Sequence, residues 1–257
     1  MSDTLLIEEM TWPQVKAAIV NGKDTAILAC GAIEQHGPHL PTGTDTYLGT
    51  AIALRAAEIA GNALVAPTLR PGLSEHHMHF PGSFTVSPET FVAMLRDYCK
   101  SLARQGFKRV IVFASHGGNA DMMRAHIPEI ARALNDQCEV RLSEGGPGET
   151  NKMVELARSH DVARGQAGAH AGFVETSMGL AAFPSLVDMS NAEAGRSDDA
   201  FFEPENIRTS QLESFLHGIQ SQAPNGVLGD PDGSSAQVGS QLIEIAATAL
   251  ASDLTVK

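Results

Sequence analysis

The chain has 257 residues, a hydrophobic fraction of 43% and a formal net charge of −12 at pH 7. This length suits a single large α/β domain over residues 1–257, with enough apolar residues for a sizeable core. The acidic balance without a basic patch argues against a nucleic-acid partner, and no apolar run approaches the ~20 residues that a membrane helix requires.

Strand-like and helix-like segments alternate along the chain. Short apolar runs predict strands at 26–30, 62–66, 108–114 and 139–142. Helical spacing or capping residues predict helices at 46–60, from Ser87-Pro88-Glu89, from about Asp121, at 150–160 and 206–218, and through Leu242 and Leu250. This alternation predicts a mostly parallel sheet sandwiched by helices, with any site at the carboxyl ends of the strands.

The segment that follows the first predicted strand is rich in groups that can bind a metal ion. It contains Glu34, His36, His39 and Asp45 within twelve positions. Glu34 and His36 are two residues apart, so in extended chain their side chains point to the same side. Asp45 stands where a helix should begin, and we expect Thr44 to cap that helix. Imidazole and carboxylate ligands suit zinc, iron or manganese, and a carboxylate can bridge two such ions.

Histidines gather in three of the predicted loops. Six of the ten histidines fall there: His36, His39, His76, His77, His79 and His116. His116 follows the third predicted strand and precedes Gly117, Gly118 and Asn119. The glycines let the backbone approach a ligand closely. A Gly-Gly turn before a helix can also hold an anion, but the chain has neither a phosphate-loop pattern nor Gly-x-Gly-x-x-Gly.

A later segment, 168–177, places His170 and Glu175 five residues apart among small residues. One interpretation is structural: a helix begins near Gly172, the small residues allow close packing, and His170 is exposed. The other is functional, with Glu175 as a metal ligand or proton carrier and His170 as a general acid or base. The residues alone leave both open.

Cysteine usage and the first residues bear on the compartment. Cys30, Cys99 and Cys138 are odd in number and far apart, and no Cys-x-x-Cys occurs. Reduced thiols are therefore expected, without a structural zinc knuckle. The first residues lack the basic-then-apolar pattern of a secretory signal. We expect a cytoplasmic protein.

Several motifs occur together in a fixed order. They are Gly31-Ala-Ile-Glu-Gln-His-Gly-Pro-His-Leu-Pro, Thr44-Asp45, Phe80-Pro81-Gly82, His116-Gly-Gly-Asn119, His170-Ala-Gly-Phe-Val-Glu-Thr-Ser177 and Gly229-Asp230-Pro231. In these motifs the chain resembles the creatininase (creatinine amidohydrolase) family over nearly its full length. The resemblance implies a parallel sheet sandwiched by helices, assembly as a homohexamer, and a centre of divalent metal ions, commonly two, at the carboxyl ends of the strands.

The same resemblance implies roles for particular residues. By motif, Glu34, His36, Asp45 and His116 correspond to metal ligands, with Asp45 as the bridge between two ions. His170 corresponds to a histidine proposed to assist catalysis in creatininase itself.

Two departures separate this chain from creatininase. Gly118 stands where creatininase has a glutamate ligand, and Glu175 is then the candidate for the missing carboxylate. Creatininase also places tryptophans over its substrate, whereas the single tryptophan here, Trp12, lies near the N-terminus. Both departures argue against creatinine itself as the substrate.

The sequence therefore predicts a metal-dependent hydrolase that cleaves a C–N bond of a small molecule, either an amide, including a cyclic amide, or a formamide. Two divalent ions, zinc first and manganese or iron as alternatives, would lower the pKa of a bound water from ~15.7 toward ~7. Glu175 or His170 would pass the proton to the leaving nitrogen. His77 would contact the substrate, and Asn119 would either donate a hydrogen bond to it or hold the turn after His116. The alternatives are a family hydrolase acting on a modified peptide or an oxidised cyclic sugar, and a non-catalytic metal-binding protein.

Overall fold

The computed structural model describes residues 4–143, 145 and 150–255. Within this part of the chain a sheet of four parallel strands runs in the order β2-β1-β3-β4. The strands are β1 (Thr25–Cys30), β2 (Ala63–Val65), β3 (Arg109–Ala114) and β4 (Glu139–Leu142). The two central strands pair over their whole length, from Thr25 opposite Arg109 to Cys30 opposite Ala114. The predicted parallel sheet is confirmed.

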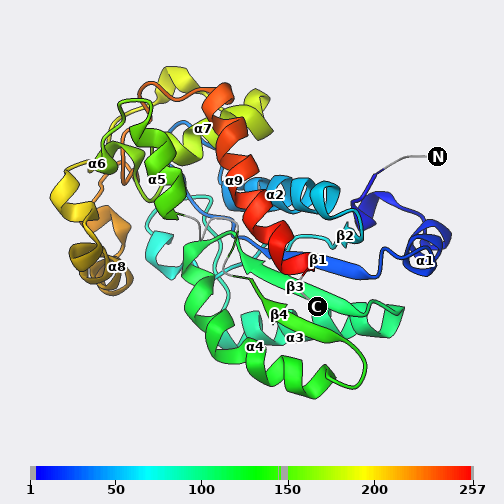
Figure 1. The fold of residues 1–257 in the computed structure, drawn as a ribbon. Coiled ribbons are helices and arrows are strands. Elements are labelled where there is room, and N and C mark those ends of the chain that lie inside the picture. Colours follow the sequence, from blue (N-terminus) through cyan, green and yellow to red (C-terminus); the bar gives the residue numbers. More distant parts are fainter. Residues whose placement is uncertain (1–3, 144, 146–149, 256–257) are drawn as a thin grey trace.

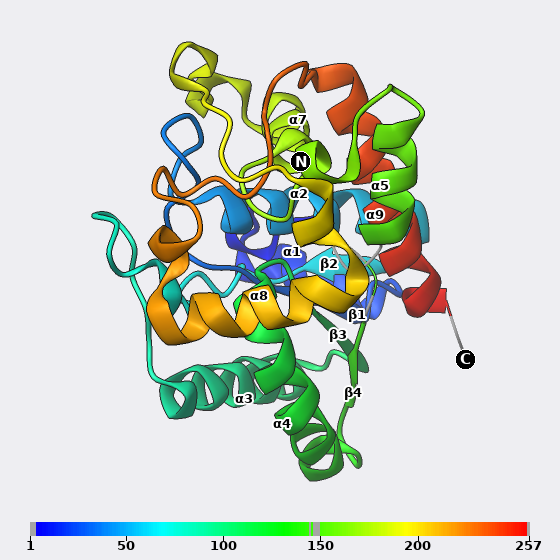
Figure 2. The same ribbon diagram turned by 90° about the vertical axis from the view of Figure 1, so that its left-hand side faces the viewer.

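Helices cover both faces of the sheet (Figures 1 and 2). On one face lie α2 (Thr44–Ala60), α5 (Thr150–Arg158), α7 (Phe173–Ala182) and α9 (Ala236–Thr255). On the other lie α1 (Trp12–Val20), α3 (Pro88–Gln105) and α4 (Ala120–Leu134). The short helix α6 (Arg164–Ala167) and the helix α8 (Pro204–His217) lie beside the carboxyl ends of the strands. The layers match the predicted fold class.

Alternate side chains of β1 pack into two different hydrophobic cores, one on each face of the sheet. Ile27 and Ala29 pack with the α2 and α9 side, whereas Ala26 and Leu28 pack with the α3 and α4 side. Every residue of β1 is buried. A strand covered on both faces needs apolar residues at successive positions, which explains the uninterrupted apolar run in the sequence.

One predicted helix start is wrong and another is confirmed. Gly43, not Thr44, stands at the N-cap of α2, and the Thr44 hydroxyl donates to the carbonyl oxygen of Pro41 at 2.7 Å. Thr44 is already helical, so its hydroxyl turns back to the preceding loop instead of capping. In α3, the Ser87 hydroxyl accepts from the N–H of Thr90 at 3.2 Å, as the Ser-Pro-Glu start predicts.

The carboxyl edge of the sheet is where the loops and α8 converge (Figure 2). The ring of Phe215, on α8, lies 4.4 Å from that of His76, measured between centroids. Trp12 is 77% exposed and starts α1, the helix that precedes β1 at the opposite end of the sheet. No helix among the described residues is both long enough and apolar enough to cross a membrane.

Candidate metal centre

Asn119 joins the loops that leave the two central strands. Its side-chain N–H groups donate to the carbonyl oxygens of Cys30 (3.1 Å) and Gly31 (2.9 Å), and its side-chain oxygen accepts from the N–H of Leu73 at 3.0 Å. The side chain is fully buried. The expected meeting of these loops at one edge is confirmed, and Asn119 fixes their spacing through main-chain partners.

A first group of possible metal ligands consists of Glu34, Asp45 and His116, all buried. Nδ1 of His116 lies 3.3 Å from Oε1 of Glu34 and 3.3 Å from Oδ2 of Asp45. Atoms bound at 2.0–2.2 Å to one tetrahedral ion are about 3.3–3.6 Å apart. These three side chains therefore have the spacing of a ligand set.

A second group consists of His36, Asp45 and Glu175. Nε2 of His36 lies 3.5 Å from Oδ1 of Asp45 and 3.8 Å from Oε2 of Glu175. Asp45 thus turns one carboxylate oxygen to each group, which is the arrangement that a bridging carboxylate needs.

Unpartnered polar atoms converge between these groups. Among the described residues, Oε2 of Glu34, Nε2 of His36 and Oδ2 of Asp45 are buried without a hydrogen bond. Each such atom costs about 1–3 kcal/mol when nothing pairs with it. Three of them in one place, on nitrogen and oxygen donors, fit a divalent cation such as zinc or manganese.

The far side of each imidazole is held by a main-chain carbonyl. Nδ1 of His36 donates to the carbonyl oxygen of Glu34 at 3.1 Å, and Nε2 of His116 donates to that of Leu73 at 3.2 Å. Each bond fixes one ring proton on the side away from the centre, so the inward nitrogen is the one that would give its lone pair to an ion once any second proton has left.

The electrostatics of the metal-free site also indicate a place for positive charge. Burial lowers the pKa of His36, but the carboxylates of Asp45, Glu175 and Glu34 together raise it to about 10. The pKa of His116 is likewise raised well above its usual value against the effect of burial. The two imidazoles therefore hold protons where the carboxylates attract a cation.

Glu175 lies in the first turn of α7 and points to the centre. Its Oε2 accepts from the N–H of Ala171 at 2.6 Å, and Ala171 has a left-handed backbone with φ of 54°. Burial raises the pKa of Glu175 to about 6, although the neighbouring His36 lowers it. The left-handed backbone of Ala171, just before α7, thus directs its N–H toward the carboxylate of Glu175.

The structural interpretation of segment 168–177 is right about the helix and the packing but wrong about the exposure of His170. The helix begins at Phe173 after Gly172, and the glycines serve packing, because a Cβ on Gly229 would lie 2.7 Å from Cα of Gly172. His170, however, is buried, not exposed, and its Nδ1 lies 3.9 Å from Oε1 of Glu34. Burial keeps the pKa of His170 well below its usual value.

The structure gives a physical reason for glycine at position 118. A Cβ there would lie 2.4 Å from Nε2 of His116 and 2.6 Å from the carbonyl oxygen of Leu73. These are the two atoms of the hydrogen bond that orients His116. No side chain fits at 118 in this arrangement, and the third carboxylate near His36 and Asp45 is that of Glu175 on α7.

The remaining histidines divide between the centre and its surroundings. His77 is buried, with Nε2 at 3.3 Å from Oε1 of Glu34. His39 hydrogen-bonds through Nε2 to the Thr176 hydroxyl at 2.9 Å and belongs to none of the ligand groups among the described residues. His79 is exposed.

Sequence reasoning missed Gln35, a buried amide between the two candidate ligands Glu34 and His36. Its side chain contacts both His77 and His170. A polar residue inside the Glu-Gln-His-Gly motif was the available signal, but spacing along the chain does not reveal partners 42 and 135 residues away.

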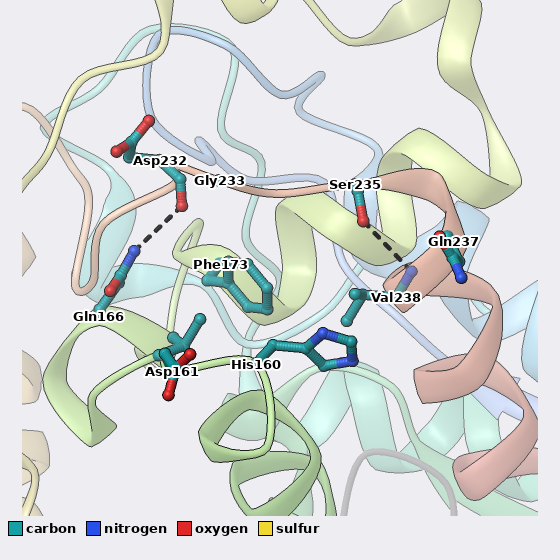
Figure 3. A pocket seen from close by; sticks show the side chains of 10 residues that line it. His160, Asp161, Gln166, Phe173, Asp232, Gly233, Ser235, Gln237 and Val238 are labelled. Carbon is teal, nitrogen blue, oxygen red and sulfur yellow. Dashed lines mark hydrogen bonds between the residues drawn. The ribbon is translucent and has the colours of Figure 1, made fainter.

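A separate cavity of about 320 Å³ lies among α7 and the ends of α5 and α9 (Figure 3). It is lined by His160, Asp161, Val162, Gln166, Phe173, Asp232, Gly233, Ser235, Gln237 and Val238. None of the candidate ligands lines it.

Comparison with known proteins decides the family. A family model, Creatininase, described as creatinine amidohydrolase, matches residues 8–254. The chain belongs to the creatininase family. It is accordingly a metal-dependent amidohydrolase, and its buried Glu, His and Asp cluster supports the binding of a divalent metal.

Three curated creatininase-family relatives differ in the activities that their names state. A creatinine amidohydrolase of Pseudomonas putida is 31% identical over 74% of this chain and 76% of its own length. A mycofactocin precursor peptide peptidase of Mycobacterium ulcerans is 27% identical over 90% of this chain and 80% of its own. A 3-dehydro-scyllo-inosose hydrolase of Thermotoga maritima is 28% identical over 70% of this chain and 57% of its own.

Solved creatininase structures share the fold. A mutant creatininase described as Zn-Zn type superposes with a TM-score of 0.80 at 26% identity, with 98% of each chain covered. A structure described as creatininase Mn gives a TM-score of 0.80 at 25% identity, again over 98% of each chain.

Proposed function

We propose that this creatininase-family protein hydrolyses a C–N bond of a small molecule, either an amide, including a cyclic amide, or a formamide, at a centre of two divalent ions. Glu34, Asp45 and His116 hold one ion, and His36, Asp45 and Glu175 hold the other. The observation that carries this proposal is the pair of side-chain groups, buried except for the half-buried Glu175, that share the two oxygens of Asp45. We propose zinc for both positions, with manganese or iron as alternatives, since all accept imidazole and carboxylate ligands.

When bound, such ions supply an activated water and polarise the carbonyl oxygen of the substrate. His170 then has the geometry of a proton carrier. Its Nε2 donates to the main-chain oxygen of Gln35 at 2.7 Å, so the lone pair of its neutral ring is on Nδ1, which faces Glu34. Because burial holds its pKa low, the ring is neutral at pH 7, and a proton taken up at Nδ1 is readily passed on to the leaving nitrogen.

Glu175 fits the part of ligand better than that of proton carrier. One of its oxygens faces His36 and accepts the Ala171 N–H, which holds the carboxylate in place. We retain proton transfer by Glu175 as a secondary role. For His77 and Asn119 we propose positioning in place of direct substrate contact, since His77 pairs with Glu34 and every polar atom of the Asn119 amide has a main-chain partner.

The substrate class is tested with the purified protein, stripped of metal and reloaded with Zn²⁺, Mn²⁺ or Fe²⁺. The panel comprises small cyclic amides including creatinine, formamides, short peptides and oxidised cyclic sugars. We expect metal-dependent hydrolysis that either opens a cyclic amide to one product carrying both a carboxylate and an amine, or releases formate and an amine from a formamide. Cleavage restricted to peptides or to cyclic sugars would replace the proposed substrate class by one of those alternatives. Tight metal binding without turnover of any compound would favour a non-catalytic metal-binding protein.

We also propose, from the family resemblance, a homohexamer located in the cytoplasm. Apolar side chains on α8 support self-association, because Leu212, Phe215 and Leu216 are each more than half exposed. Light scattering coupled to gel filtration measures the mass. A monomer at micromolar concentration would contradict the assembly.

A further inference from the structure

Main-chain groups fix the orientation of the buried Gln35 amide. Its Oε1 accepts from the N–H of Gly37 at 2.9 Å, and its Nε2 donates to the carbonyl oxygen of Gly226 at 3.1 Å. An N–H can only donate and a carbonyl can only accept, so these two contacts decide which end of the amide is oxygen. The amide packs directly against Gly226, since a Cβ there would lie 1.9 Å from Oε1 of Gln35.

The amide nitrogen of Gln35 also faces two imidazoles. It lies 2.9 Å from Nδ1 of His77 and 3.0 Å from Nε2 of His170. Nε2 of His170 is also 2.7 Å from the main-chain oxygen of Gln35, which only accepts. The proton of His170 therefore sits on Nε2, and this nitrogen cannot accept from the amide.

The number of hydrogens on the Gln35 amide then determines which ring nitrogen of His77 carries the proton. The amide has two hydrogens, one of which goes to Gly226, and the other has Nδ1 of His77 as its acceptor. With Nδ1 of His77 accepting, the proton of this neutral imidazole lies on Nε2. That nitrogen is 3.3 Å from Oε1 of Glu34, to which it donates.

We propose that Gln35 is a positioning residue that fixes the proton of His77 on Nε2, so that His77 donates to the metal-binding carboxylate of Glu34, while the same residue orients His170 with Nδ1 free. The part that concerns catalysis rests on the proposed function. A donor to Glu34 orients this carboxylate and tunes its charge as a ligand.

The assignment also bears on a third cluster. Glu34, His76 and His77 stand close enough to be considered as a metal site. The nitrogen of His77 nearest to Glu34 carries a proton in this network, so it has no lone pair for an ion. His77 is therefore a partner of a ligand and not a ligand itself.

The direct test is the position of ring protons in the ¹⁵N-labelled, Zn²⁺-loaded protein. Long-range ¹H–¹⁵N correlation spectra distinguish protonated from unprotonated ring nitrogens, and His77→Asn and His170→Asn variants assign the signals. We expect both rings to carry the proton on Nε2 with an unprotonated Nδ1. A wild-type spectrum with the His77 proton on Nδ1 would overturn the proposal without any further variant.

Two substitutions of Gln35 separate positioning from mere packing. In Gln35→Glu the amide donor becomes an acceptor, so we expect Nδ1 of His77 to become protonated, while His170 keeps its proton on Nε2 because the main-chain acceptor remains. An unprotonated Nδ1 of His77 in folded Gln35→Glu protein would contradict the proposal. In Gln35→Met we expect unchanged metal content and KM, with kcat about 10–100-fold lower.

Gln222→Met is the matched control, because the side-chain hydrogen bonds of Gln222 go to Ser210 and Ser214 and Gln222 belongs to none of the ligand groups among the described residues. It should leave kcat and both ring protons unchanged, and a loss of kcat equal to that of Gln35→Met would count against a specific role. The spectra need no substrate. If no compound of the panel is hydrolysed, the proposed function fails while the proton positions still decide the role of Gln35.

Discussion

Asp45 lies between two histidines, with Oδ1 at 3.5 Å from Nε2 of His36 and Oδ2 at 3.3 Å from Nδ1 of His116. Replacing Asp45 by Ala removes one ligand from both groups at once. We expect Asp45→Ala to lose tight metal binding and turnover together, as measured by elemental analysis after dialysis and by the assay. Asp121→Ala is the control, because the Asp121 side chain is 99% exposed on α4. An Asp45→Ala protein with full metal content would refute the shared role.

His170 should separate catalysis from metal binding. Its Nδ1 faces the centre, and its Nε2 is fixed by a main-chain oxygen. His170 stands close enough to Glu34 and His36 to form a possible ligand group with them, but neither of the two groups that share Asp45 includes it. We expect His170→Ala to keep its metal and to lose about 10²–10⁴-fold in kcat. His160→Ala, at an exposed position on the separate cavity, should keep wild-type kcat. Loss of metal in His170→Ala would instead make His170 a ligand.

Adjacent glycines offer a matched test of the space beside His116. A Cβ on Gly118 would meet His116 and Leu73, whereas a Cβ on Gly117 would have nothing within 4 Å. We expect Gly118→Ala to lower the free energy of unfolding by about 1–3 kcal/mol and to weaken metal binding, because the His116 ring must move. Thermal unfolding and metal titration measure both effects. Equal behaviour of Gly117→Ala and Gly118→Ala would contradict the packing argument.

Metal binding should release protons. In the metal-free protein the neighbouring carboxylates, acting against burial, raise the pKa of His36 to about 10 and that of His116 well above its usual value. Both rings are thus protonated at pH 7, and an ion can bind only after these protons leave. The metal affinity should therefore rise about tenfold for each unit of increase in pH and for each proton displaced. Calorimetry in buffers of different ionisation enthalpy counts the protons, and a count of zero would be inconsistent with this picture.

The sequence predicted the sheet well because its strands are buried on both faces. β1 and β3 contain continuous apolar runs, at 26–30 and 110–114, whose short length favours buried strands over helices, and their parallel pairing places the following loops at one edge. The start of α2 was missed by one residue, since Thr44 and Gly43 both suit a cap and only the local hydrogen bonding of the Thr44 hydroxyl decides between them.

The candidate ligands were visible because they cluster in motifs, but their partners were not. The proton positions of His77 and His170 depend on Gln35, whose contacts cross 42 and 135 residues of chain. Position 118 has no room for a side chain partly because the main-chain carbonyl oxygen of Leu73 lies beside it. The type of side chain at position 73 does not predict this main-chain contact. Such contacts follow from the folded loops and not from residue spacing.

The most direct test of the two-ion centre is anomalous diffraction at the zinc edge from crystals of the Zn²⁺-loaded protein. We predict one zinc ion about 2.0–2.2 Å from atoms of Glu34, Asp45 and His116, and a second at the same distance from atoms of His36, Asp45 and Glu175. Zinc peaks that lie elsewhere, or that have no contact with Asp45, would contradict the account.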